Sequence, residues 1–157
     1  MNKTDKILTA LVHCELAGSA KALTEAREEL RMAYLDYEES RKNPEVMIME
    51  LLQELNAPDH LAGFPYVVHG TLLLVENPSL INKLTKDFYP AIAENFGITA
   101  LRADRGIRMV IERIWLRCSW DTLNKYFGNI VSQEKGKPCN GEFMARLANI
   151  IRLEQLK

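Results

Sequence analysis

Four residues in the middle of the chain carry the chemistry that the sequence offers. Arg102, Arg105 and Arg108 follow one another at intervals of three, and Asp104 lies among them. A guanidinium donates two parallel hydrogen bonds to O6 and N7 of guanine in the major groove, and a carboxylate accepts one from the amine of cytosine. These residues predict a surface that reads the base edges of double-stranded DNA.

The arginines need a helix that presents them, and the flanking residues predict one. Pro90 suits the first turn of a preceding helix, because the N–H that proline lacks has no partner there. Gly97 can adopt the positive φ that ends this helix, and the Thr99 hydroxyl can cap the next one. Residues 90–108 are thus predicted to form parts of two helices joined by a tight turn.

The second predicted helix has one apolar face. The positions that share this face are Ala103, Ile107, Val110, Ile111 and Ile114. Arg105 and Arg108 lie opposite, with Leu101 beside them and Arg102 toward the flank. This is the helix-turn-helix pattern, in which the second helix enters the major groove. Spacing alone favours the other interpretation, a surface helix whose arginines are merely solvated.

The charge distribution favours the first interpretation. The net charge of the whole chain is −1. Residues 1–98 carry 9 basic and 15 acidic side chains, a balance of −6, whereas residues 99–157 carry 11 and 6, a balance of +5. A basic half that begins at the second predicted helix is the electrostatic pattern expected for contact with phosphates.

Further motifs extend from Arg41 to the C-terminus. They are Leu51-Leu-Gln-Glu-Leu55, Pro58-Asp-His60, Gly63-Phe-Pro-Tyr66, Asn82-Lys-Leu-Thr-Lys-Asp-Phe-Tyr-Pro90, Phe127-Gly128, Lys137-Pro138, Glu142-Phe143 and Arg152-Leu-Glu154. Together with the three arginines they make this part of the chain resemble the effector domain of the sporulation response regulator known as stage zero sporulation protein A.

The resemblance implies a compact all-α domain that binds DNA and regulates transcription. The residues that it places at the DNA are Thr99, Leu101, Arg102, Asp104, Arg105 and Arg108 in the helix-turn-helix, and Lys135 and Lys137 in a basic loop. The matching region of the family at residues 119–128 is tied to contact with the sigma subunit of RNA polymerase. Core packing is the other explanation for the apolar residues of that segment.

Departures from the family pattern fall within the second predicted helix, which we call the reading helix because it would contact the bases. The family usually has serine at Leu101, glutamate at Asp104 and alanine at Gly106. Glycine inside a helix costs about 1 kcal/mol relative to alanine, and aspartate has a shorter reach than glutamate. Because the three arginines are retained, we expect DNA affinity to persist while the preferred sequence changes.

Residues 1–42 are predicted to form a helical arm, and residues 43–157, which begin at Asn43-Pro44, to form the effector-type domain. Within the arm, residues 19–39 contain neither glycine nor proline and carry one narrow apolar stripe. The stripe comprises Leu23, Ala26, Leu30, Ala33 and Tyr37. It suits a partner helix, which favours a homodimer. The stripe can equally pack on the chain's own domain, and residues 7–12 can pair with it in a helical hairpin.

Other classes of protein find little support. The three histidines are isolated, and the sequence has neither a glycine-rich phosphate loop nor a nucleophile elbow, so we expect no enzyme, metal or cofactor. The apolar runs are too short for a membrane helix, and the N-terminus does not resemble a signal peptide. Cys14, Cys118 and Cys139 form no ligand pattern and favour a reducing cytoplasm.

The sequence therefore predicts a cytoplasmic, sequence-specific, DNA-binding transcriptional regulator. No alternating strand–helix pattern precedes Arg41, so we expect no receiver domain in this chain. The alternative is an interaction module of the same fold with weakened DNA readout, which pairs with a regulator or with RNA polymerase. Leu101 and Gly106 favour the alternative, and the arginines favour DNA binding.

Overall fold

The computed structural model describes residues 3–16, 18–132 and 134–157. Within these ranges the regular elements are eight α-helices, one short 3-10 segment and one short π segment, and there is no strand. The prediction of an all-α fold is confirmed. In the same ranges, none of the helices combines the length and the apolar character needed to cross a membrane. Contacts divide the chain into two units, Met1–Val46 and Met47–Lys157.

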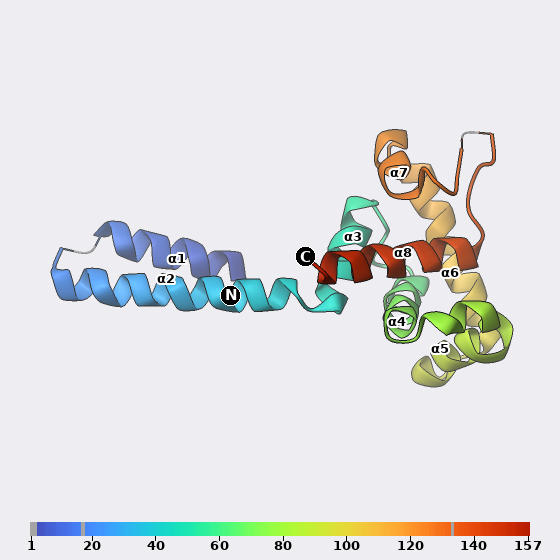
Figure 1. Ribbon diagram of the computed structural model, residues 1–157, viewed down its shortest axis with the longest axis horizontal. Coiled ribbons are helices and arrows are strands. Elements are labelled where there is room, and N and C mark those ends of the chain that lie inside the picture. Colours follow the sequence, from blue (N-terminus) through green and yellow to red (C-terminus); the bar gives the residue numbers. More distant parts are fainter. Residues whose placement is uncertain (1–2, 17, 133) are drawn as a thin grey trace. The chain divides into compact units, whose positions relative to one another are not determined.

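The first unit is an antiparallel helical hairpin, in which α1 (Lys3–Leu16) and α2 (Ala20–Arg41) run side by side (Figure 1). Ser19 begins α2, since its hydroxyl accepts a hydrogen bond from the Ala22 backbone N–H at 3.2 Å. Nδ1 of His13 in α1 lies 3.0 Å from Oε2 of Glu29 in α2. Of the arrangements that the sequence left open for the arm, the structure shows the hairpin.

The apolar stripe of α2 is the least exposed side of that helix. Ala26 is buried, and the four other residues of the stripe are half-buried, as expected for the side along which α1 packs. The stripe that the sequence suggested as a dimer seam is therefore used within the hairpin. On α1 the large apolar side chains that stay exposed are Leu8, Leu11, Val12 and Leu16.

The second unit is built from six α-helices. In chain order they are α3 (Pro44–Glu54), which begins at the boundary of the two units, α4 (Gly63–Glu76), α5 (Tyr89–Phe96), α6 (Ala100–Arg117), α7 (Trp120–Phe127) and α8 (Asn140–Gln155). The segments η1 (Pro78–Lys83) and η2 (Leu84–Phe88) connect α4 to α5. The apolar residues 66–75, whose β-branched side chains also suit a strand, lie in α4, as the resemblance implied.

α4 packs against both α6 and α8 (Figure 1). The rings of Trp115, Phe127 and Phe143 join α6, α7 and α8, with centroids 5.2 to 6.2 Å apart. Leu123 and Phe127 of α7 are buried in the core. The core-packing explanation of these two residues is confirmed.

α4 and α6 approach each other closely where two glycines face each other. A Cβ on Gly106 would lie 2.8 Å from the ring of Tyr66, and a Cβ on Gly63 would lie 2.0 Å from the carbonyl oxygen of Gly106. Gly106 thus has a packing role that offsets its low helix propensity. Its presence in the reading helix needs no explanation by weakened DNA readout.

We expect Gly63→Ala to destabilise the second unit, because the added Cβ would collide with backbone, which yields less than a flexible side chain. The loss in the free energy of unfolding should reach the upper end of the range typical of overpacking, which is about 1–3 kcal/mol. Urea unfolding of the whole chain measures it. The control is Gly18→Ala, whose added Cβ meets nothing within 4 Å. Equal unfolding midpoints for the two variants would contradict the packing explanation.

Candidate nucleic-acid interface

The predicted helix-turn-helix is present, and its local geometry follows the residues that predicted it. α5 has Pro90 in its first turn and ends at Gly97, which has φ = +64°. The Thr99 hydroxyl caps α6 by accepting a hydrogen bond from the Arg102 backbone N–H at 3.1 Å. The two helices of the motif are thereby held by backbone and capping interactions that are local in the sequence.

α6 buries one side and exposes the other. The residues of its buried side are the predicted Ala103, Ile107, Val110, Ile111 and Ile114. Arg102 and Arg105 are exposed near the start of the helix, and Leu101 beside them is 57% exposed. These three side chains can reach a ligand without disturbing the core.

Asp104 and Arg108 are engaged with the chain itself. Oδ1 of Asp104 accepts a hydrogen bond from Nδ2 of Asn140 at 2.7 Å, and the Asp104 carbonyl oxygen accepts from the same nitrogen at 3.0 Å. Nη1 of Arg108 donates to the Pro138 carbonyl oxygen at 2.8 Å, and its Nε donates to Glu112 at 3.3 Å. Both side chains are half-buried. Arg102 and Arg105 of the same helix are instead exposed.

Tyr89 completes the network around Asp104, and sequence reasoning gave it no role. Its hydroxyl lies 3.3 Å from Nδ2 of Asn140, which also donates to Asp104, so α5, α6 and α8 meet at one polar point. Burial, followed by the hydrogen bond and charge of Asp104, raises the pKa of Tyr89 to about 12, although the bond from Asn140 opposes the shift. No local pattern at Tyr89 indicates this role, because its partners are distant in the sequence.

The raised pKa of Tyr89 predicts a loss of stability at alkaline pH. An unfolded tyrosine ionises near pH 10, so stability present below pH 10 should fall by up to about 1.4 kcal/mol per pH unit until the folded group ionises near pH 12. Urea unfolding at pH 9, 10 and 11 measures this. Tyr89→Phe should remove this part of the pH dependence. A variant that loses as much stability as the wild type over this range would contradict the assignment.

α8 begins with a cysteine cap, Cys139. Sγ of Cys139 accepts from the Glu142 backbone N–H at 3.4 Å, and Oε2 of Glu142 accepts from the Cys139 backbone N–H at 3.0 Å. This second bond is the main cause that lowers the pKa of Glu142. The reciprocal pair is a capping box. It leaves the side chain of Asn140 free to bond with Asp104.

The basic loop precedes this cap. Lys135 and Lys137 are both exposed, and Nζ of Lys135 lies 3.5 Å from Glu142. The loop turns at Gly136, which has φ = +74°, and the Gly136 N–H donates to the Ser132 carbonyl oxygen at 2.9 Å. Since Pro138 is bonded to Arg108, the loop ends beside α6.

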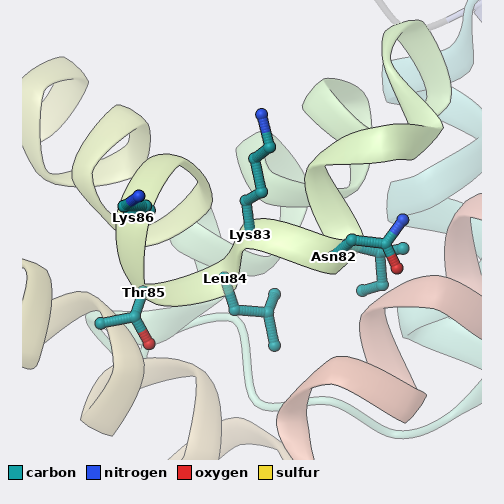
Figure 2. A pocket seen from close by; sticks show the side chains of 6 residues that line it. Asn82, Lys83, Leu84, Thr85 and Lys86 are labelled. Atoms are coloured by element: carbon teal, nitrogen blue, oxygen red, sulfur yellow. The ribbon is translucent and has the colours of Figure 1, made fainter.

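A hollow of about 410 Å³ lies where η1 meets η2 and is lined by residues 81–86. Figure 2 shows the Lys83 side chain on the opposite side of the ribbon from Leu84. Lys83 is paired with Asp87 at 3.7 Å. Leu84 packs near Gly141 of α8, where an added Cβ would meet it. Four of the six lining residues are polar, but their side chains do not converge on one point (Figure 2), so we do not assign a ligand to the hollow.

The fold and the exposed arginines define a helix-turn-helix protein whose second helix is the candidate reading helix. A family model described as "Sporulation initiation factor Spo0A C terminal" matches residues 48–151. The chain belongs to this family of DNA-binding effector domains of sporulation regulators, which is not a family of enzymes. The resemblance found in the sequence is confirmed.

Proposed function

We propose that the chain is a sequence-specific transcriptional regulator of the cytoplasm that reads double-stranded DNA with α6 in the major groove. The observation that carries the proposal is the exposure of Arg102 and Arg105 on the first turns of a helix whose other side is buried in the core. A rigid helix with free guanidinium groups at its start matches the way a helix-turn-helix contacts base edges.

In this proposal the two arginines each donate paired hydrogen bonds to a guanine, and Leu101 contacts a thymine methyl. The N-terminus of α6 at Thr99 adds backbone N–H groups and the positive end of the helix dipole, which favour a phosphate. Lys135 and Lys137 supply further phosphate contacts, which position the protein without reading sequence. The excess of basic residues in 99–157 supports this division of roles.

Selection of bound duplexes from a random pool, followed by a salt titration of the best one, tests the proposal. We expect a defined consensus and an affinity that falls steeply with salt, because each phosphate contact releases counterions.

If no duplex binds in a salt-dependent way, the interaction module of the same fold replaces the proposal. Its partner would then be sought among regulators and the sigma subunit of RNA polymerase. Asp121 and Asn124 of α7 are exposed and available for that contact.

We further propose that two chains pair through the outer side of α1. Four large apolar side chains, from Leu8 to Leu16, recur there at helical spacing and are 44 to 77% exposed. Within the described part of the hairpin, the only buried apolar residues are Ala10 and Ala26. Two alanines bury little surface for a unit of this size, and units this small usually need a partner.

A second copy of the chain is the occupant that we infer for this side of α1. Two hairpins that pair in this way make a four-helix bundle, in which the exposed apolar side chains of the two α1 helices cover each other. Pairing also suits the proposed activity, since one helix-turn-helix contacts few bases, whereas two joined copies contact half-sites about one helical turn apart. The homodimer proposed from the sequence is thus retained, with its seam moved from α2 to α1.

A further inference from the structure

The apolar outer side of α1 has an acidic residue near each end. The four exposed apolar side chains of this side run from Leu8 to Leu16. Asp5 lies three residues before Leu8 and Glu15 three residues after Val12, so both carboxylates share this side of the helix. Both are exposed. A second copy that covers the apolar side chains therefore also has to accommodate these two charges.

The two charges distinguish the directions in which a pair of α1 helices can run. In a parallel pair Glu15 would lie level with Glu15 of the second copy and Asp5 with Asp5, and like charges brought together across an interface oppose binding. Val12 lies midway between Leu8 and Leu16. In an antiparallel pair centred on Val12, the two Glu15 residues would be separated by about 9 Å along the axis and the two Asp5 residues by about 21 Å. Leu8 would then lie level with Leu16 of the second copy, and the helix dipoles would run in opposite directions, which is favourable.

The register of the hairpin gives the place at which the chain leaves such a pair. Nδ1 of His13 lies 3.0 Å from Glu29, and α1 and α2 are antiparallel, so the level of Val12 on α1 corresponds to that of Leu30 on α2. α2 ends at Arg41, which is about 16 Å further along the helix at 1.5 Å per residue. In the antiparallel pair the two Arg41 residues would therefore be separated by about 33 Å along the axis.

We propose that the arm is a molecular ruler, in which two α1 helices pair antiparallel about Val12 and the chain selects DNA with two half-sites about one helical turn apart. The separation of the two exits is close to one turn of the duplex, which is about 34 Å. The link to the next helix is short, since only Lys42 and Asn43 lie between α2 and α3. Their backbone N–H groups donate to the carbonyl oxygens of Glu39 and Ser40 at 3.2 and 3.1 Å. The inference rests on the proposed DNA binding and pairing, and adds the direction of pairing and the spacing of the half-sites.

Cross-linking of the full-length chain tests the direction of pairing. Chains with Leu8→Cys are mixed with chains with Leu16→Cys, a short bis-maleimide is added, and mass spectrometry identifies the linked peptides. The antiparallel pair predicts that links between positions 8 and 16 exceed links between two copies of position 8. In the control mixture, Glu28→Cys replaces Leu16→Cys at an exposed position of α2 away from its apolar stripe, and few links to position 8 should form. Links mainly between two copies of position 8 would show a parallel pair and overturn the proposal, whereas a monomeric wild type would refute the proposed pairing itself.

The spacing of half-sites on DNA tests the ruler. Two copies of the selected half-site are placed about one turn apart in one duplex, and about 5 bp further apart, or half a turn, in a second. The full-length chain should bind the second duplex about a hundredfold more weakly, because linked binding is lost when geometry prevents both sites from being filled together. A flexible glycine–serine insert between Lys42 and Asn43 is the control, which should keep the pairing and reduce this preference. Equal affinity of the unmodified chain for both duplexes would overturn the ruler. Absence of binding to any duplex would refute the proposed DNA binding and the ruler with it, and the cross-links would still decide the direction of pairing.

Discussion

A chain that carries Leu8→Glu and Leu11→Glu is expected to be monomeric and to bind a two-half-site duplex about a hundredfold more weakly than the wild type. The two leucines are 55% and 44% exposed on the outer side of α1. Charges there would have to be buried in the proposed four-helix bundle, and a buried unpaired charge is costly. Loss of pairing removes the second binding event, whose linkage to the first typically adds a factor of about 10² to 10⁴ in affinity.

Sedimentation of the intact chain at tens of micromolar, together with a titration of the two-half-site duplex, measures both effects. Thr9→Glu is the matched control, because Thr9 is an exposed position of the same helix that lies beside the groove between α1 and α2. The control should remain a dimer, and circular dichroism should show similar helix content in all three chains. A wild-type monomer at this concentration would refute the dimer.

The second large effect is expected when Arg102 and Arg105 are both replaced by alanine. Each arginine that pairs with a guanine contributes about 1–3 kcal/mol of discrimination, so the double variant should bind the selected sequence little better than random duplex. Thermal unfolding should change little, because both side chains are exposed and the apolar side of α6 is untouched. Competition between the selected and random duplexes at fixed salt measures the loss.

Arg113→Ala is the control for this pair of substitutions. Arg113 is also exposed on α6 but lies beyond its first turns, where a reading helix makes few base contacts. It should lower affinity for both duplexes alike or not at all. If the Arg102 and Arg105 variant retains full preference for the selected sequence, α6 is not the reading helix, and the interaction module becomes the better explanation.

The elements of the helix-turn-helix could be predicted because their signals are local. Gly97 ends α5 through its own backbone conformation, and Thr99 caps α6 through a hydrogen bond to a residue three positions away. The buried side of α6 was equally predictable, since a helix repeats every 3.6 residues and needs an apolar side to pack. The exposure of Arg102 and Arg105 follows from the same periodicity.

The roles of Asp104 and Arg108 could not be predicted in this way. On a helical wheel Arg108 lies on the same polar side as Arg105, yet it is bonded to Pro138, 30 residues along the chain. The partner of Asp104 is 36 residues away, at the start of another helix. The placement of Gly106 against Tyr66 likewise depends on the crossing of α4 and α6. Periodicity describes which side of a helix faces outward but contains no information on which distant backbone lies beside it.

The helical arm, α1 and α2, likewise has some features that follow from local sequence and others that depend on contacts between distant residues. Its sequence by itself determined two helical segments, the Ser19 boundary and one apolar stripe on the second helix, because propensity, capping and spacing act within a few residues. Which helix covers the stripe was decided by the tertiary structure, in which α1 packs along it and leaves its own outer leucines exposed. An apolar stripe specifies that something must cover it, since exposure to water costs free energy in proportion to area. The identity of the covering helix depends on chain connectivity and on the competing partners within reach.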